Sequence, residues 1–369
     1  ATQKFTIAPI IQGFNSLIQA PYLSGKTTSL LIAVLQRTNL NISKTQALIL
    51  APTREQAKHL HQVLKSMTAP TQGNIRTHLC AGGIGGSSAL DDIKAARSGP
   101  HIVVGTLGRM CDVFASGRGG YNKADVSRVE MVAFDDFGDV VAFPDFSDRV
   151  PALIRAMPRG VQLVVTSSTM TPAVLDFTNK FMGSSHVKRI HVPHIDPSNT
   201  KIVHSVIRVQ EPRHKHMDLI RLLMSCKAKS FDQAIVFTNT SRELEWLADM
   251  ISSSTNGVWQ AATFHRESGP GQRSQVVQNF NSGKVKVLVT SDLLGRGLSD
   301  MRQVSLVVHY NVPVAPEDYM RRSTRCTVRC EVDGGAKRCG KGMVVSLVTE
   351  EEREMMSIIE MAAGVGIDE

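Results

Sequence analysis

Apolar and polar residues alternate along the chain in a way typical of buried strands joined by helices. Short apolar runs rich in β-branched residues predict strands at residues 47–51, 101–106, 129–134 and 162–166. A second series of such runs lies at residues 202–209, 234–237, 285–289, 304–309 and 343–348. Helix-patterned segments separate most of these runs. This alternation predicts an α/β protein with mostly parallel sheets flanked by helices.

The pattern is interrupted once, near the middle of the chain. Residues 192–201, VPHIDPSNTK, are proline-bearing and polar, which is typical of a linker between domains. A chain of 369 residues is also long for one hydrophobic core. We therefore expect two tandem α/β domains, residues 1–195 and 196–369.

A short polar loop, APYLSGKTT at residues 20–28, precedes a helix-like segment. It contains what a phosphate-binding loop needs: Gly25 for close backbone approach, the Lys26 ammonium for the terminal phosphates, and the Thr27 hydroxyl for magnesium. In the segment that follows, one helix face carries Leu30, Leu31, Val34 and Leu35. The N-terminus of that helix would point at the anion. If only this fragment is considered, the alternative to a phosphate-binding loop is a turn that simply precedes a core helix.

Further motifs follow the predicted strands, at the strand ends where open parallel sheets bind ligands. They are PTREQA (52–57), Gly82-Gly83, TLGR (106–109), DDFG (135–138), SST (167–169), SDLLGRGLS (291–299) and RRSTRCTV (321–328). In order and spacing they resemble the PTREL, GG, TPGR, DEAD, SAT, TDxxxRGxD and HRxGRxGR motifs of DEAD-box RNA helicases. The resemblance covers nearly the whole chain. It implies two RecA-like domains that close together on ATP and single-stranded RNA.

The resemblance also implies ATP and magnesium as cofactors, with roles for individual residues. Nucleotide contacts would come from Gln3, Ala20, Ser24, Gly25, Lys26, Thr27, Thr28 and Asp292. Asp135 would hold magnesium together with Thr27, and Asp136 would orient the attacking water. The catalytic set would comprise Lys26, Asp135, Asp136, Arg322 and Arg325, with Arg325 reaching the terminal phosphate as an arginine finger. If Asp135 and Asp136 are considered alone, the alternative to a catalytic pair is a loop that merely caps a helix.

For RNA, the resemblance implies contacts to the sugar-phosphate backbone. In the first domain these would come from Thr53, Arg54, Gly82, Gly83, Thr106, Gly108 and Arg109, and in the second from Arg273, Ser291 and Gly297. Backbone N–H groups at glycine turns and a few arginines bind phosphates without reading bases, so the predicted binding is largely independent of sequence. For Arg273, an ordinary surface charge is the alternative, because Pro270 stands where the family tends to have glutamine.

Most departures from the family pattern concern ATP rather than RNA. They are Leu23, Asp136, Gly138, Ser299, Arg321 and Val328. The Asp136 side chain is one methylene shorter than the family glutamate, and misplacement by about 1 Å can cost roughly a hundredfold in rate. The sequence therefore predicts a degenerate DEAD-box-like RNA-binding protein with weak or lost ATP hydrolysis, acting in ribonucleoprotein assembly, for instance of ribosomes. An active ATP-dependent RNA helicase is the alternative, and a nucleotide-binding protein without an RNA role is a third.

Composition agrees with a nucleic-acid partner. The net charge of +9 favours a polyanion, and no apolar run approaches the length of a membrane span. Six cysteines are too few for a disulfide scaffold and indicate a reducing compartment inside the cell. No targeting signal can be identified. A mitochondrial localisation is predicted only from the assembly role, with the nucleolus and the cytoplasm as alternatives. We expect protein partners within a ribonucleoprotein and no membrane partner.

The last part of the chain contains a polar piece that is longer than the family usually has there. This piece, RCEVDGGAKRC at residues 329–339, is expected to be either a solvent loop or a docking element. The spacing of Cys326, Cys330 and Cys339 admits a zinc site, but neither a CxxC pair nor a companion histidine completes it.

Overall fold

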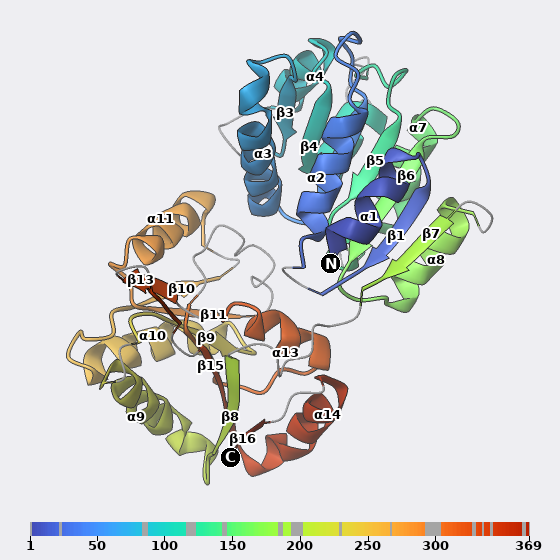
Figure 1. The fold of residues 1–369 in the computed structure, drawn as a ribbon. Helices are drawn as coiled ribbons and strands as arrows, with labels where there is room; N and C mark the ends of the chain where they lie inside the picture. Colours follow the sequence, from blue (N-terminus) through green and yellow to red (C-terminus); the bar gives the residue numbers. More distant parts are fainter. Residues whose placement is uncertain are drawn as a thin grey trace. The chain divides into compact units, whose positions relative to one another are not determined.

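The computed structural model describes residues 2–21, 24–82, 88–115, 123–141, 146–183, 187–192, 202–228, 231–265, 268–291, 304–326, 330–333, 336–339, 342–363 and 367–368. The chain divides into two compact units, Ala1–His194 and Ile195–Glu369 (Figure 1). Of the expected linker, residues 192–201, all but Val192 lie outside the described residues. Each unit is described by itself.

Among its described residues, unit 1 contains a seven-stranded sheet with the order β3-β4-β2-β5-β6-β1-β7, in which neighbouring strands are parallel. The strands are β1 Asn15–Gln19, β2 Ala47–Ala51, β3 Thr77–Cys80, β4 Ile102–Thr106, β5 Met131–Phe134, β6 Gln162–Ser167 and β7 Val187–His191. The α-helices are α1 Thr2–Ile11, α2 Lys26–Arg37, α3 Arg54–Thr68, α4 Ala89–Arg97, α5 Leu107–Met110, α6 Phe137–Val140, α7 Phe146–Ala156 and α8 Pro172–Phe181. A 3-10 turn, Ala69–Thr71, follows α3, and a π-helical turn, Cys111–Ala115, follows α5.

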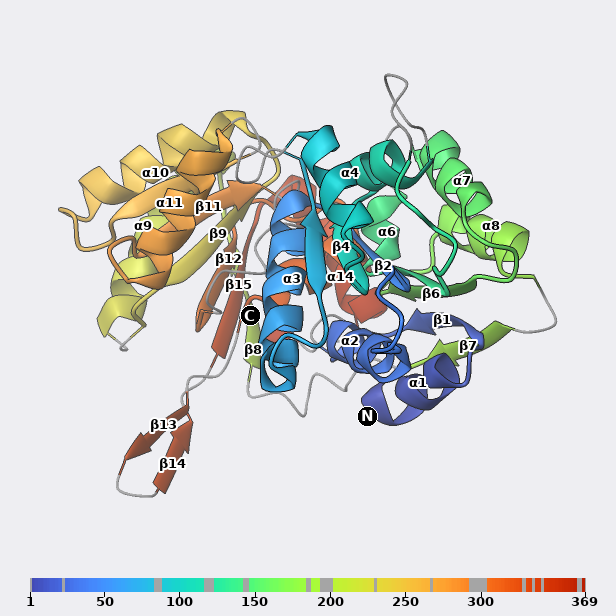
Figure 2. The same ribbon diagram turned by 90° about the horizontal axis from the view of Figure 1, so that it is seen from above.

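The sheet of unit 1 is buried on both faces, which explains why its strands are nearly continuous apolar runs. Successive residues of a strand point to opposite faces: Leu48 and Leu50 lie in one hydrophobic cluster and Ile49 in the other. Helices α1, α2 and α3 cover the Ile49 face, and α4, α5, α7 and α8 cover the opposite face (Figure 2). Because helices cover both faces, the polar residues that follow the strands lie where the strands end rather than on a face of the sheet.

Unit 2 repeats this architecture. Its described residues form a parallel seven-stranded sheet with the order β10-β11-β9-β12-β15-β8-β16. The strands are β8 Ile202–Arg208, β9 Ala234–Thr238, β10 Ala261–Phe264, β11 Val287–Ser291, β12 Leu306–His309, β15 Gly342–Val348 and β16 Ile367–Asp368. The α-helices are α9 Lys215–Ala228, α10 Arg242–Ser254, α11 Pro270–Asn281, α13 Pro316–Ser323 and α14 Arg353–Ala363. Helices α9 and α10 pack on one face, and α11, α13 and α14 on the other.

The predicted α/β architecture with parallel sheets is confirmed, and every predicted strand is present with small shifts at its ends. The strands that periodicity did not identify include β3, β7 and β10. All three lie at the edge of a sheet and are only partly buried, so they carry polar residues such as His78 and Lys188 where a central strand would be apolar. Tertiary pairing, rather than apolar pattern, makes these segments strands.

The extra piece near residue 330 forms a short antiparallel ribbon. Strand β13, Cys330–Asp333, pairs with β14, Ala336–Cys339, so that Cys330 stands opposite Cys339 (Figure 2). Within the described part of the chain the ribbon pairs with no strand of either large sheet. The insertion is therefore a separate hairpin, and its docking role stays a prediction.

Candidate functional site

The phosphate-loop segment and the two DEAD-like motifs meet at one edge of the unit 1 sheet. Strands β5, β6 and β1 are neighbours, and their carboxyl ends carry Asp135, Ser167 and the loop that leads to Lys26. The backbone N–H of Ala20 donates to the carbonyl of Ser167 at 3.1 Å, which ties the start of the loop to β6. The fold thus brings together residues more than a hundred positions apart at the edge where parallel sheets bind ligands.

Lys26, the first residue of α2, has a side chain only 4% exposed. Its Nζ donates to the carbonyls of Ala20 at 2.9 Å and Pro21 at 2.8 Å, and it lies 3.8 Å from Oδ1 of Asp136. Gly25 precedes it with φ 90°, a left-handed conformation that glycine adopts without strain. The loop backbone therefore curls around the ammonium group. Leu23, one of the departures from the family pattern, lies outside the described residues.

Gln3 lies against this loop although it is more than twenty residues away in sequence. A Cβ built on Gly25 would come within 3.1 Å of the Gln3 amide nitrogen, so the amide packs on the glycine. The neighbouring Ser24 hydroxyl is buried, and among the described residues no hydrogen-bond partner reaches it. Ala20 is buried and Thr28 is exposed on the first turn of α2. Apart from Asp292, which lies outside the described residues, the predicted nucleotide contacts thus gather around the start of α2.

Asp135 forms the centre of the site and has a side chain 6% exposed. Its two carboxylate oxygens accept hydrogen bonds from the hydroxyls of Thr27, at 2.7 Å, and Thr166, at 2.9 Å. Burial, together with the nearby Asp136 carboxylate, raises the pKa of Asp135 to about 6, while the two hydroxyls and the Lys26 ammonium act in the opposite direction. Thr166 was not predicted from the sequence, because only its place at the end of an apolar strand marks it.

Asp136 adopts a left-handed backbone conformation with φ 48°. Its N–H donates to the Thr166 hydroxyl at 3.2 Å, so the threonine bridges both aspartates. Its Oδ1 is buried, and no hydrogen-bond donor reaches it within the described part of the chain. Two carboxylates therefore stand side by side, and the Lys26 ammonium acts on both.

These donors fit a magnesium ion. Thr27 and Asp135 offer hard oxygen ligands, and a buried carboxylate with a raised pKa gains from a cation. The described residues contain no group of three or more His, Cys, Asp or Glu side chains that would hold a metal by itself. That scarcity suits magnesium, which is typically held by one or two carboxylates together with water and substrate phosphates.

The DDFG and SST segments touch at Gly138. Its N–H donates to the Ser167 hydroxyl at 3.2 Å. A Cβ built on Gly138 would lie 2.9 Å from the Ser167 Oγ and 2.9 Å from the Thr169 Oγ1. The structure thus brings the two motifs into contact, with only a backbone N–H of Gly138 available to link them.

The first-domain residues predicted to bind RNA lie at the carboxyl ends of three neighbouring strands, in the order β3-β4-β2. Gly82 follows β3, Thr106 ends β4 with Gly108 and Arg109 in the turn of helix after it, and Thr53 and exposed Arg54 follow β2. Thr53 also caps α3 by accepting a hydrogen bond from the N–H of Gln56 at 3.2 Å. These residues share one edge of the sheet. Gly83 lies outside the described residues.

Two charged residues of this region were not predicted from the sequence. Asp92 on α4 pairs with Arg109, and Arg149 on α7 lies beside Gly108, where a Cβ would come within 3.4 Å of its Nη1. Neither residue belongs to a recognisable motif. Only their position in the folded chain reveals them.

In unit 2 the predicted residues are described only in part, because Asp292 and Gly297 lie outside the described residues. Ser291 ends β11 and is buried, and Arg273 is half-buried on α11. Arg325 is partly exposed in the turn after α13. The predicted RNA-contacting role of Arg273 and Ser291 and the finger role of Arg325 stay predictions.

Arg322 is 1% exposed within unit 2. It donates to the Asn311 carbonyl at 2.9 Å and the Asn239 Oδ1 at 2.7 Å, and its guanidinium lies 5.3 Å from the centre of the Phe237 ring. The neighbouring Arg321, which replaces the family histidine, forms an ion pair with Asp318 at 2.7 Å. The structure therefore assigns both side chains contacts inside their own unit.

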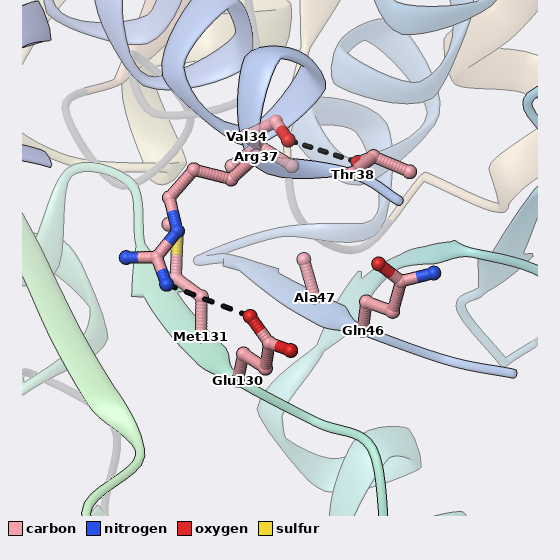
Figure 3. Close-up of a pocket in the computed structure, with 7 residues that line it drawn as sticks. All are labelled: Val34, Arg37, Thr38, Gln46, Ala47, Glu130 and Met131. Carbon is pink, nitrogen blue, oxygen red and sulfur yellow. Dashed lines mark hydrogen bonds and ion pairs between the residues drawn. The ribbon is translucent and has the colours of Figure 1, made fainter. Parts of the chain in front are cut away.

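Two hollows of unit 1 lie away from the predicted site. One is a cavity of about 10 Å³ lined by Val34, Arg37, Thr38, Gln46, Ala47, Glu130 and Met131, where Arg37 and Glu130 approach to 3.5 Å (Figure 3). That volume holds about one water molecule. The other, of about 650 Å³, lies at the amino ends of β1 and β6 near Phe14 and Arg159. Neither contains a residue predicted from a motif.

Two family models match the chain. Residues 1–177 match the DEAD/DEAH box helicase model, and residues 214–328 match the helicase conserved C-terminal domain. The ATP-dependent RNA helicase eIF4A of Sclerotinia sclerotiorum is 33% identical over 369 residues, which is 100% of this chain and 85% of that protein. The chain belongs to the DEAD-box helicase family. The resemblance expected from the motifs is thereby confirmed.

Solved structures of other DEAD-box proteins share the fold. Saccharomyces cerevisiae Dbp5, bound to RNA and ADP BeF3, matches with a TM-score of 0.80 at 21% identity, over 100% of this chain and 88% of that one. A DEAD box protein of Methanococcus jannaschii matches with a TM-score of 0.54 at 27% identity, over 100% and 91%. The two parallel-sheet units of this DEAD-box protein are tandem RecA-like domains. None of the helices described here is long and apolar enough to cross a membrane.

Proposed function

We propose that this DEAD-box protein binds RNA and ATP with magnesium but hydrolyses ATP weakly or not at all, and that it serves as a ribonucleoprotein assembly factor. The observation that carries the proposal is at Gly138. Lys26, Thr27 and Asp135 form a cluster. Gly138 touches the SST segment, but it has no side chain that could couple the nucleotide state to that segment.

In the nucleotide half, Lys26 would bind the terminal phosphates, and Gln3 would contact the base beside the loop. Thr27 and Asp135 would hold magnesium, which when bound would neutralise charge on the phosphates. Asp136 would orient a water molecule, but its side chain is one methylene shorter than the glutamate of the family, and its carboxylate lies 3.8 Å from Lys26, outside hydrogen-bond distance. A carboxylate set back by about 1 Å suffices for a roughly hundredfold loss in rate.

In the RNA half, Thr53, Arg54, Thr106, Gly108 and Arg109 would contact the sugar-phosphate backbone from one edge of the unit 1 sheet. The net charge of +9 supports a polyanionic partner. So does the family, because the eIF4A relative is an ATP-dependent RNA helicase and Dbp5 was solved with RNA. We infer rRNA or another structured RNA as the target, with ribosome maturation as the favoured setting and a mitochondrial home as a further prediction.

The deciding experiment measures RNA affinity and phosphate release by the purified chain, with and without ATP, magnesium and single-stranded RNA. We expect RNA binding without nucleotide and slow turnover. Asp136→Glu combined with Gly138→Asp should raise turnover, because the longer carboxylate reaches further and the new one stands beside the Ser167 and Thr169 hydroxyls, once these two side chains rotate to admit its Cβ. Lys26→Ala is the control that should abolish any turnover in both backgrounds.

Fast RNA-stimulated turnover by the unmodified chain, lost in Lys26→Ala, would establish the alternative of an active ATP-dependent RNA helicase. RNA affinity that does not change with salt would refute the RNA assignment, since phosphate contacts must weaken as salt rises.

A further inference from the structure

Arg109 is held in a defined position by the rest of unit 1. It lies in α5, directly after β4, and its side chain is 15% exposed. Its Nη1 donates to Oδ2 of Asp92 at 2.9 Å. Because a guanidinium carries five N–H donors in a rigid fork, one ion pair sets the direction of the whole group.

The partner carboxylate is more deeply buried than the arginine. Asp92 on α4 is 1% exposed, and its other oxygen, Oδ1, lies 3.1 Å from Nε2 of His78 on β3. A buried carboxylate is costly unless it is paired and hydrogen-bonded. The two contacts connect α4 to β3 on one side and to α5 on the other. Asp92 is therefore a fixed point to which Arg109 is attached.

Gly82 is the second residue that restricts where the Arg109 guanidinium can lie. A Cβ built on it would lie 3.2 Å from Nε of Arg109 and 2.6 Å from its Nη2, and the second distance is shorter than real Cβ contacts. The guanidinium thus packs directly on the backbone of residue 82, and any side chain there would displace it. The resemblance to DEAD-box helicases implies that the backbone of Gly82 contacts RNA. The packing indicates a different role, which is to leave room for the Arg109 guanidinium.

We propose that Asp92 and Gly82 are positioning residues that fix the Arg109 guanidinium for a phosphate of the bound nucleic acid. The inference rests on the proposed RNA-binding function and goes beyond it by adding a residue outside every motif. A free arginine side chain loses rotamer freedom when it binds a phosphate. Here that loss occurs on folding, so RNA encounters an arginine that is already oriented.

Single-stranded RNA binding, measured by fluorescence anisotropy over a range of salt concentrations, tests the proposal. Arg109→Ala should weaken binding and reduce the slope of log affinity against log salt by about 0.7, the value for one lost phosphate contact on a single strand. Asp92→Asn should weaken binding about three- to tenfold with a similar loss of slope. In the Arg109→Ala background, Asp92→Asn should change affinity less than twofold.

Asp91→Asn is the matched control, because it removes the same charge one residue away and Asp91 is exposed. Removal of a negative charge alone should leave RNA binding unchanged or strengthen it slightly. Weaker binding by Asp92→Asn therefore has the opposite sign to a net-charge effect. A fall in melting temperature without a change in salt slope would identify a purely structural role for Asp92 and would overturn the proposal.

Gly82→Ala is a second variant that tests the same position without altering charge. It keeps the backbone N–H of residue 82 but pushes the guanidinium away, so we expect the affinity and slope losses of Arg109→Ala. Gly82→Ala with wild-type affinity and slope would also overturn the proposal. If Arg109→Ala itself bound RNA as the unmodified chain does, the RNA contact of the proposed function would fail, whereas a loss confined to Arg109→Ala would refute only the positioning role.

Discussion

Asp135→Asn should stabilise the metal-free protein at neutral pH, although it removes a predicted magnesium ligand. Burial and the Asp136 carboxylate raise the Asp135 pKa from 3.8 to about 6, so the folded state disfavours the ionised form. Asparagine has the same shape. Because the Thr27 and Thr166 hydroxyls can each donate or accept, the amide can keep both hydrogen bonds.

The sign and size of the effect follow from the pKa. Between about pH 4 and 6 the folded protein holds a proton that the unfolded chain has lost, so the free energy of unfolding falls as pH rises through this window. Above pH 6 the full penalty, on the order of 3 kcal/mol, applies. For a unit of this size, about 2–4 °C per kcal/mol gives a rise in melting temperature of roughly 6–12 °C at pH 7.5.

Thermal melts in a metal chelator between pH 4.5 and 8 measure this effect. The difference between Asp135→Asn and the unmodified chain should be largest above pH 6 and should shrink steadily towards pH 4.5. The control is Asp91→Asn: hydrogen bonds from Ser88 lower the Asp91 pKa, so its removal should lower the melting temperature at neutral pH and have less effect as the solution becomes acidic. A melting temperature for Asp135→Asn that is lower at pH 7.5, or an offset that does not vary with pH, would refute the reasoning.

Further predictions concern the loop, the sheet and the buried arginine. Lys26→Ala should weaken ATP binding at least tenfold in a fluorescent-nucleotide titration and leave nucleotide-free RNA binding unchanged; equal ATP affinity would contradict the loop assignment. Gly105→Ala would place a Cβ 2.1 Å from the Cys80 carbonyl oxygen, so urea unfolding should show a loss of about 2–3 kcal/mol, whereas Gly271→Ala, with open space around it, should change stability by less than about 1 kcal/mol. Similar stabilities for the two variants would disprove the close approach of β3 and β4. Arg322→Lys cannot reproduce both contacts of the guanidinium and should cost about 2–4 kcal/mol in thermal melts; an unchanged melting temperature would contradict its structural role.

Most central strands could be predicted from the sequence because the fold and the apolar pattern agree there, although β1, an interior strand between β6 and β7, was missed. Residues of β2 and β9 are buried throughout, so hydrophobicity alone marks them. The edge strands β3 and β7 could not be found in this way, because they are only partly buried and contain polar residues such as His78 and Lys188. Their pairing partners identify them, and pairing is a property of the folded chain.

In the candidate site, too, some residues could be predicted from the sequence and others could not. The phosphate-loop roles of Lys26 and Thr27 could be predicted from their residue types and spacing, whereas the predicted role of Asp135 came from the resemblance to DEAD-box helicases. The contacts of Thr166 and Asp92 depend on the strand register and on which helix face meets the sheet. No local pattern contains that information, so these residues emerge only from the folded structure.

The two hydrogen bonds to Asp135 have a consequence for how such a protein can diverge. One carboxylate is shared by the first turn of α2, through Thr27, and the last part of β6, through Thr166. Substitutions in these three segments should therefore be epistatic, with double-mutant energies that do not add. A change that is neutral in one lineage would be harmful in another whose Thr166 or Thr27 had already drifted, so the three segments are constrained to evolve as a set rather than one residue at a time.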